Sequence, residues 1–428
     1  MDRKNYPALG EEIIWDRLPN GLTIAVVPRP GFTKKLAYFV TDYGAIHTEY
    51  SVNGAACHSP AGVAHYLEHK LFDMPGRDIT AEFAAMGASV NAFTGFDMTA
   101  YYFSCTEQFP ENLSLLLEFV STPFFTQESV EKEQGIIDQE IGMNEDNPES
   151  RIFELLMDAM YRNHPIRTPI LGTRDSIKAI SPQVLEQCHK AFYHPGNMLL
   201  CVVGDVDAAQ VRQIAESILP AQSAPMAEPT RQWPEQMTCP QAYTDAQMEV
   251  SMPMFQVGFK AEPLGRGREA VRQELIGDLA AEALFGESSR LYLQLYEEGL
   301  IDSAFGGGFE TVEGMAMLTA FGDSDDPEAV LEAILEEAEA IAREGIPEAD
   351  FLRMKRSAMG RRIRGLDSFD ATCFRICAYH FSGFDYFRFP EVYEQLESKE
   401  IQAFLQRVVT RDRTSMACIY PIQQEDET

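Results

Sequence analysis

Hydrophobic and polar positions change their period several times along the first half of the chain. Residues 22–30 (LTIAVVPRP) and 34–45 (KKLAYFVTDYGA) are rich in β-branched and aromatic side chains, which predicts two strands. We expect a helix from about residue 60 to 72, with Ser59 as its N-cap. Alternation with Thr, Phe and Tyr returns near residue 88, so strands resume there.

Two further helices are expected from about Glu111 and from Gln127. The second runs through ESVEKEQGIIDQEIGMNED, which contains no Gly or Pro except Gly135 and Gly142. Helices and strands therefore come in runs. This order favours an α+β fold with a mostly antiparallel sheet over a doubly wound parallel sheet.

Helical and strand periodicity are both interrupted once, over residues 219–240. Five prolines and several small polar residues interrupt this stretch, LPAQSAPMAEPTRQWPEQMTCP. We interpret it as an interdomain linker between an N-terminal domain, residues 1–218, and a C-terminal domain, residues 241–428.

The two predicted domains end alike. Residues 181–203 (SPQVLEQCHKAFYHPGNMLLCVV) and 398–420 (SKEIQAFLQRVVTRDRTSMACIY) each begin with Ser and read as an amphipathic helix, a turn and an apolar strand. This shared order indicates an old duplication of one α+β unit.

Composition and charge narrow the classes of partner. The chain has 428 residues, of which 45% are apolar, and a net charge of −31, which disfavours nucleic acid and anionic membranes as partners. The first residues, MDRKNYPALGEEIIWDRL, show no apolar core followed by a small-residue cleavage site, no apolar stretch approaches the length of a membrane span, and the eight cysteines form no CxxC pair. We therefore expect a cytoplasmic protein with reduced thiols.

Candidate chemistry is concentrated in GVAHYLEHKLF. His65 and His69 are four residues apart, so on a helix both imidazoles project from one face and could bind one metal ion. Glu68 lies on the flank of that face, where its carboxylate could reach a metal-bound water without being a ligand. This HxxEH pattern is the inverse of HExxH.

A catalytic zinc ion needs a third protein ligand, and the Glu-rich helix that follows offers more than one. Glu133 and Glu140 are seven residues apart, so one could bind the metal while the other hydrogen-bonds a ligand imidazole. Glu131 and Asp138 have the same separation. Spacing alone does not show which of the two pairs provides the metal ligand.

Several segments, in order, resemble the insulinase or pitrilysin family of inverzincin zinc peptidases: GVAHYLEHKLF, GASVNAFTGFDMTAYYF, VEKEQGIIDQEI, HPIRTPILGT and AFYHPGNMLLCVVGDVD. The residues of these motifs are most similar to those of a bacterial subfamily named for an association with aminopentanol modification of elongation factor P. The resemblance implies two homologous domains arranged as a clamshell that encloses an extended peptide. It also implies Glu140 as the third zinc ligand and Glu133 as its companion.

The same resemblance implies a zinc metalloendopeptidase mechanism. Glu68 would act as the general base towards water and return the proton to the leaving amine. Asn91 and Ala92, in NAFT, match the positions of an edge strand that meets the substrate backbone.

The second half departs from the family pattern. Active single-chain relatives carry an Arg and, seven residues later, a Tyr that reach the substrate; here Tyr296 lies near the first position and Asp302 at the second. Arg290 could replace the missing Arg, and a self-sufficient enzyme could use Tyr292 or Tyr296 as the donor to the oxyanion. We expect instead a heterodimer with a paired insulinase-type subunit that supplies the Arg and Tyr. The alternative is a non-catalytic subunit of an insulinase-type assembly.

Overall fold

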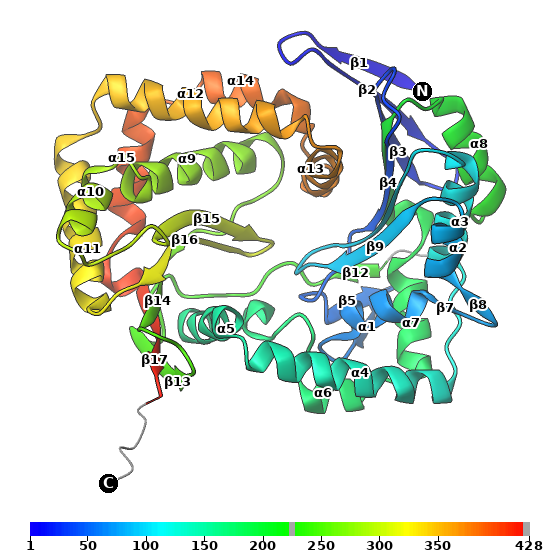
Figure 1. Ribbon diagram of the computed structural model, residues 1–428, viewed down its shortest axis with the longest axis horizontal. Coiled ribbons are helices and arrows are strands. Elements are labelled where there is room, and N and C mark those ends of the chain that lie inside the picture. Colours follow the sequence, from blue (N-terminus) through cyan, green and yellow to red (C-terminus); the bar gives the residue numbers. More distant parts are fainter. Residues whose placement is uncertain (222–226, 423–428) are drawn as a thin grey trace. The chain divides into compact units, whose positions relative to one another are not determined.

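The computed structural model describes residues 1–221 and 227–422. The chain forms two compact units, each assembled from three segments, and Figure 1 colours these segments along the sequence. None of the described helices is both long and apolar enough to cross a membrane. Unit 1 comprises Met1–Ile141, Thr168–Thr230 and Arg362–Arg388, and unit 2 comprises Gly142–Arg167, Arg231–Arg361 and Phe389–Thr428.

Unit 1 is built on a seven-stranded sheet in the order β1-β2-β3-β11-β4-β10-β9. Neighbouring strands are antiparallel except β3 and β11, which are parallel. The central strand β11, MLLCVVG, is buried throughout, as expected for a strand covered on both faces. The strands span Asp2–Tyr6 (β1), Glu11–Arg17 (β2), Thr23–Pro28 (β3), Met198–Gly204 (β11), Lys35–Thr41 (β4), Thr99–Cys105 (β10) and Ser89–Thr94 (β9).

Helices cover both faces of this sheet (Figure 1). On one face α1, α2 and α3 contact β9 and β10, and on the other α13 contacts β4 and β11. The helices of unit 1 are α1 (Val63–Leu71), α2 (Ile79–Ala85), α3 (Phe109–Ser121), α6 (Arg174–Lys178), α7 (Pro182–Phe192), α8 (Ala208–Ile218) and α13 (Phe369–Phe381). Helix α4 (Gln127–Glu145) continues from unit 1 into unit 2.

The predicted linker is partly ordered into secondary structure. Residues 222–226 lie outside the described residues, whereas β12 (Ala227–Pro229) pairs with β5 (Glu49–Val52), which pairs with β6 (Ala55–His58). A short hairpin, β7 (Asp73–Met74) and β8 (Arg77–Asp78), follows α1.

Unit 2 repeats the core of unit 1 with five strands in the order β13-β17-β14-β16-β15. They span Tyr243–Met248 (β13), Thr414–Pro421 (β17), Met254–Ala261 (β14), Met315–Asp323 (β16) and Gly306–Val312 (β15). Its helices are α5 (Pro148–Met160), α9 (Gly267–Phe285), α10 (Arg290–Glu297), α11 (Pro327–Glu344), α12 (Glu348–Gly365, ending in unit 1), α14 (Phe389–Glu394) and α15 (Ser398–Val408). Short 3-10 turns in the described part of the chain are Pro165–Arg167 (η1), Pro195–Asn197 (η2), Tyr386–Arg388 (η3) and Arg411–Arg413 (η4).

The repeat is visible strand by strand. The order β3-β11-β4-β10-β9 corresponds to β13-β17-β14-β16-β15, and in each series the first pair is parallel and the others antiparallel. The segment α7-η2-β11 corresponds to α15-η4-β17. The predicted α+β fold with two homologous, mostly antiparallel domains is thus confirmed.

The compact units are not the two sequential halves. Helix α5, which precedes residues 219–240, packs on the sheet of unit 2, and α13, which follows them, packs on the sheet of unit 1. The domain division at residues 219–240 stays a prediction about homologous segments.

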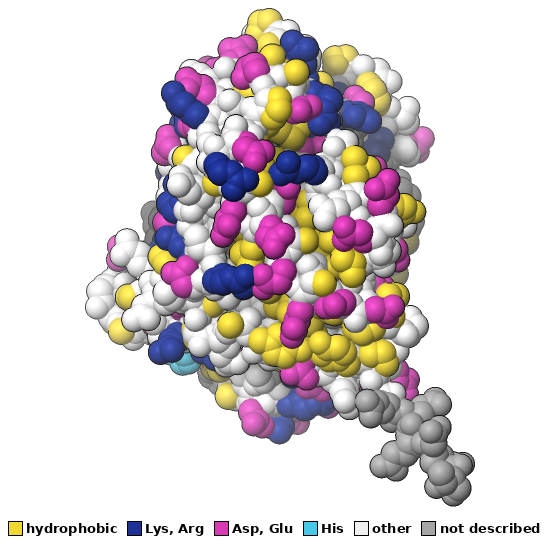
Figure 2. All heavy atoms as spheres, turned by 90° about the vertical axis from the view of Figure 1, so that its left-hand side faces the viewer, with side chains coloured by type: hydrophobic (Ala, Val, Ile, Leu, Met, Phe, Trp, Pro, Cys, Tyr) yellow, Lys and Arg dark blue, Asp and Glu magenta, His cyan; other side chains and the backbone are white. Residues whose placement is uncertain are grey.

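Acidic side chains are spread over the surface. Figure 2 shows one face of the molecule, on which Asp and Glu side chains are scattered among Lys and Arg. A scattered excess of one sign is typical of general surface charge rather than of one cation-binding site.

Candidate metal centre

Helix α1 begins at Val63, later than predicted, and Ser59 is not its N-cap. The N-cap is Gly62, whose φ of +89° lies in the left-handed region that favours glycine. A Cβ atom on Gly62 would lie 2.4 Å from the carbonyl oxygen of Leu171. The loop that contains Leu171 therefore packs directly against the start of α1.

Two side chains anchor α1 on the beginning of α4. The buried ammonium of Lys70 donates to the carbonyl oxygen of Ser129 at 3.4 Å and also pairs with Asp73. The hydroxyl of Tyr66 donates to the carbonyl oxygen of Val130. These bonds fix the two helices that carry the predicted metal ligands relative to each other.

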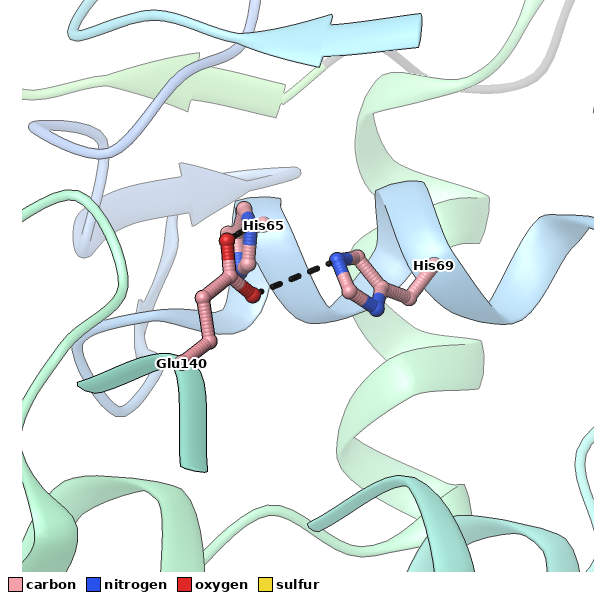
Figure 3. A group of neighbouring side chains, drawn as sticks. All are labelled: His65, His69 and Glu140. Atoms are coloured by element: carbon pink, nitrogen blue, oxygen red, sulfur yellow. Dashed lines mark ion pairs between the residues drawn. The ribbon is translucent and has the colours of Figure 1, made fainter. Parts of the chain in front are cut away.

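His65 and His69 on α1 point towards Glu140 on α4 (Figure 3). The Nε2 atom of each imidazole lies 3.6 Å from a carboxylate oxygen of Glu140. One donor atom from each residue lies within 4.8 Å of the other two. Within residues 1–221 and 227–422, no other group of three such side chains meets this condition.

The geometry fits Zn²⁺. Ligand atoms bound to one tetrahedral zinc ion at about 2.0–2.1 Å lie about 3.3 Å apart, which is close to the 3.6 Å between each histidine Nε2 and a Glu140 oxygen. Two imidazoles and one carboxylate form a donor set that catalytic zinc sites use, with the fourth position left for water.

Glu133 holds His69 in the orientation that metal binding needs. One carboxylate oxygen of Glu133 lies 2.9 Å from Nδ1 of His69, which leaves Nε2 directed at Glu140. Burial lowers the pKa of His69, but the hydrogen bond and charge of Glu133 outweigh this effect, so the pKa is raised above its ordinary value. The close approach of the His65 imidazole holds the pKa of Glu140 below its ordinary value, although burial opposes this shift.

The other carboxylate pair has different partners. Asp138 forms an ion pair with Arg174 at 2.8 Å. Glu131 accepts a hydrogen bond from the side chain of Gln127 on the exposed side of α4. Both carboxylates are therefore engaged outside the cluster.

Glu68, the predicted base, is held by a residue that sequence reasoning did not single out. The hydroxyl of Thr94, the last residue of β9, donates a hydrogen bond of 2.6 Å to the Glu68 carboxylate. The only available signal was the position of Thr94 at the end of NAFT, which does not predict a contact with α1.

Strand β9 is an edge strand, as predicted for Asn91 and Ala92. It pairs with β10 on one side and ends the sheet on the other. The backbone N–H of Ala92 donates to the side-chain oxygen of Asn91 at 2.9 Å. That N–H is therefore bonded to a side chain of its own strand.

The C-terminal residues singled out from the sequence lie on or after α10. Arg290 pairs with Glu337 of α11 at 2.7 Å, which is a helix-packing contact. Tyr296 is 54% exposed and stacks on Tyr292 at 6.0 Å. The carboxylate of Asp302 accepts a hydrogen bond from the backbone N–H of residue 304.

Comparison with known proteins gives consistent matches along the chain. Residues 55–174 match the insulinase family, peptidase family M16, and residues 179–358 match the peptidase M16 inactive domain. The uncharacterized zinc protease YmfH of Bacillus subtilis is 36% identical over 425 residues, which cover 97% of this chain and 98% of the relative. The uncharacterized zinc protease YmxG of the same organism is 26% identical over 321 residues, which cover 72% of this chain and 75% of the relative.

Comparison with solved structures finds the same fold in other proteins. An M16-like peptidase from Alicyclobacillus acidocaldarius superposes with a TM-score of 0.92 at 32% identity, covering 96% of this chain and 99% of that one. A protease from Helicobacter pylori superposes with a TM-score of 0.83 at 18% identity, covering 96% of this chain and all of the other, which shows the shared fold.

Proposed function

The chain belongs to the insulinase family, peptidase family M16, and on that premise we propose that it is a zinc-dependent metalloendopeptidase acting on extended peptides. The observation that carries the proposal is the convergence of His65, His69 and Glu140, with Glu68 close enough to contribute to the raised pKa of His69. The relatives YmfH and YmxG, both named zinc proteases, support zinc as the metal. Membership of the elongation-factor-P-associated subfamily stays a prediction.

His65, His69 and Glu140 would hold the metal, and Glu133 would keep His69 in the required tautomer. A bound Zn²⁺ supplies Lewis acidity that lowers the pKa of water and polarises the scissile carbonyl. Glu68 accepts the proton of the attacking water and delivers it to the leaving amine, while Thr94 orients the carboxylate.

Substrate binding is assigned to the edge of β9. A peptide strand that pairs with Asn91 and Ala92 gains main-chain hydrogen bonds whatever its sequence. It also lies directly beside Thr94 and therefore beside the base Glu68.

We further propose that a paired insulinase-type subunit completes the site. Asp302 replaces the expected Tyr and would bring negative charge towards a developing oxyanion. The ion pair between Arg290 and Glu337 supports a helix-packing role for Arg290. The test compares turnover by the isolated chain with turnover after addition of a partner that retains the Arg and Tyr. The hypothesis of a paired subunit is wrong if the isolated chain is equally fast and Tyr296→Phe slows it by about a hundredfold.

The opposing hypothesis is a non-catalytic subunit of an insulinase-type assembly. It leaves the complete set of His65, Glu68, His69 and Glu140 without a chemical role.

The eight cysteines are free, which supports the cytoplasm as the compartment.

The experiment is hydrolysis of a quenched fluorescent, unstructured peptide by the zinc-loaded chain, with and without a paired subunit. Glu68→Gln should retain zinc but lower the rate by about 10²- to 10⁴-fold. Absence of hydrolysis under both conditions would support the non-catalytic subunit.

A further inference from the structure

A cavity with a volume of about 430 Å³ lies at the start of α9 in unit 2. Small-molecule sites in proteins commonly have volumes of roughly 300–1,000 Å³. The walls come from residues 261–266, which join β14 to α9, and from α9, β15 and α15. Every lining residue belongs to unit 2, whereas the metal cluster belongs to unit 1, so the cavity is not part of the metal centre.

Two aromatic rings form the apolar wall of the cavity. Phe309 of β15 and Phe404 of α15 meet edge to face, with their centroids 5.5 Å apart, and Ala270 of α9 lines the cavity beside them. All three side chains are buried. The ring of Phe309 fits against α9 because Gly277 has no side chain, since a Cβ atom there would lie 2.3 Å from the ring. Such a wall suits an aromatic ring or a branched alkyl group.

One end of this apolar wall is positively charged. The guanidinium of Arg407 lies 5.8 Å from the centroid of the Phe404 ring. Arg407 pairs with Glu262 at 3.0 Å, and Arg413 pairs with the same carboxylate at 2.9 Å. Burial raises the pKa of Glu262, but Arg413 and Arg407 outweigh this effect and lower it. Two positive charges therefore share one carboxylate here.

The loop before α9 repeats this arrangement. Arg266 pairs with Glu313 at 3.2 Å, and Arg231 pairs with the same carboxylate. The remaining carboxylate of the lining, Glu269, accepts a hydrogen bond of 2.8 Å from the side chain of Gln273. Four arginines thus stand against three carboxylates around the cavity, so an anionic group is favoured there in spite of the acidic surface of the chain.

We propose that this cavity binds a small amphipathic carboxylate, with an aryl or branched alkyl group against Phe309 and Phe404 and the carboxylate on Arg407. The planar guanidinium matches a carboxylate in a two-bond geometry, and the rings exclude water from the apolar part of the ligand. A free aryl acid and the C-terminal residue of a peptide both present this chemistry. The inference does not rest on the proposed peptidase activity.

The test is binding of 3-(4-fluorophenyl)propionate to the zinc-loaded full chain, followed by the ¹⁹F line width of the ligand. We expect a Kd of about 0.1–1 mM, and at least about tenfold weaker binding of the neutral propanamide analogue. Arg407→Gln should weaken binding of the acid about tenfold. Arg411→Gln is the matched control, because Arg411 is exposed, pairs with Glu332 and does not line the cavity.

A second pair of variants tests the volume of the cavity. Ala270→Leu places a larger side chain in the cavity and should abolish binding, whereas Ala283→Leu, at a half-buried position of the same helix outside the lining, should not. Thermal unfolding of both variants checks that the fold is retained. Glu140→Gln should bind the acid as the parent protein does, and loss of binding in that variant would place the ligand at the metal cluster and overturn the proposal.

The two sources of the ligand are distinguished with a short Ser- and Gly-containing peptide that ends in 4-fluorophenylalanine. Binding of the peptide with a free C-terminus, but not of its C-terminal amide, assigns the cavity to peptide ends, and binding of the small acid alone assigns it to free acids. Either result supports the proposal. No binding of acid or peptide at up to about 10 mM, equal affinity for the neutral analogue, or unchanged binding in Ala270→Leu would overturn it.

Discussion

Nδ1 of His69 and a carboxylate oxygen of Glu133 lie 2.9 Å apart, so the imidazole of a predicted zinc ligand is held by a residue of the helix that also carries Glu140. Removing the negative charge of Glu133 should weaken the metal site without removing a ligand. Glu133→Gln is expected to lower zinc affinity by about 10- to 100-fold, measured by competition with a chelator. Glu131→Gln, on the exposed side of the same helix, should leave the affinity unchanged.

The hydrogen bond from Thr94 to Glu68 predicts a loss of turnover. Thr94→Val keeps the shape of the side chain but removes the donor, so the carboxylate loses its orientation, and kcat should fall about tenfold. Thr94→Ser retains the hydroxyl and should restore most of kcat, with zinc content equal in all three proteins. Equal rates for Thr94→Val and Thr94→Ser would show that the hydroxyl has no part in positioning the base.

Gly62 predicts a loss of stability that depends on a close approach as well as on backbone conformation. Gly62→Ala should lower the free energy of unfolding by more than the roughly 1–2 kcal/mol of a left-handed residue, because its Cβ would meet Leu171. Gly87 also has a positive φ, of +70°, but a Cβ atom there would have no neighbour within 4 Å, so Gly87→Ala isolates the backbone effect. Equal thermal shifts in the two variants would exclude the clash.

Glu235 predicts an acid-sensitive contribution to stability. Burial raises the pKa of Glu235, but hydrogen bonds from the backbone N–H groups of Asn163, Arg162 and His164, together with the charge of Lys260, outweigh it and lower the pKa. A lowered folded-state pKa means that the contribution is complete above the unfolded value of about 4.3 and is lost as the pH falls through the folded value.

Thermal unfolding between pH 7 and 3 checks this prediction. Glu235→Gln should be less stable than the parent protein at pH 7, and the difference should shrink below about pH 4. Glu228→Gln, an exposed carboxylate of the same segment, serves as the control. A difference that grows as the pH falls would contradict the assigned direction.

The elements that depend on local pattern could be predicted from the sequence. Periodicity located β3, β4, β9 and α4, and the spacing of His65 and His69 on one helix fixed their common direction. The repeated helix, turn and strand at the two domain ends appears as α7-η2-β11 and α15-η4-β17.

Features that depend on contacts between distant segments could not be predicted from the sequence. The start of α1 at Gly62 is set by the loop around Leu171, more than a hundred residues away in the sequence. The bond from Thr94 to Glu68 and the packing of Phe374 on Phe93 each join different elements, and neither contact alters the local periodicity. Which of two equally spaced carboxylate pairs faces the imidazoles depends on the rotation of α4, and spacing carries no information about that rotation.

The central claim, a zinc ion held by His65, His69 and Glu140, is tested most directly by elemental analysis of protein purified without chelators. The account predicts about one zinc per chain in the parent protein and in Glu68→Gln, and a markedly lower content in Glu140→Gln, because only the last variant loses a ligand. Well under one zinc per chain in the parent protein, or loss of zinc from Glu68→Gln but not from Glu140→Gln, would contradict it.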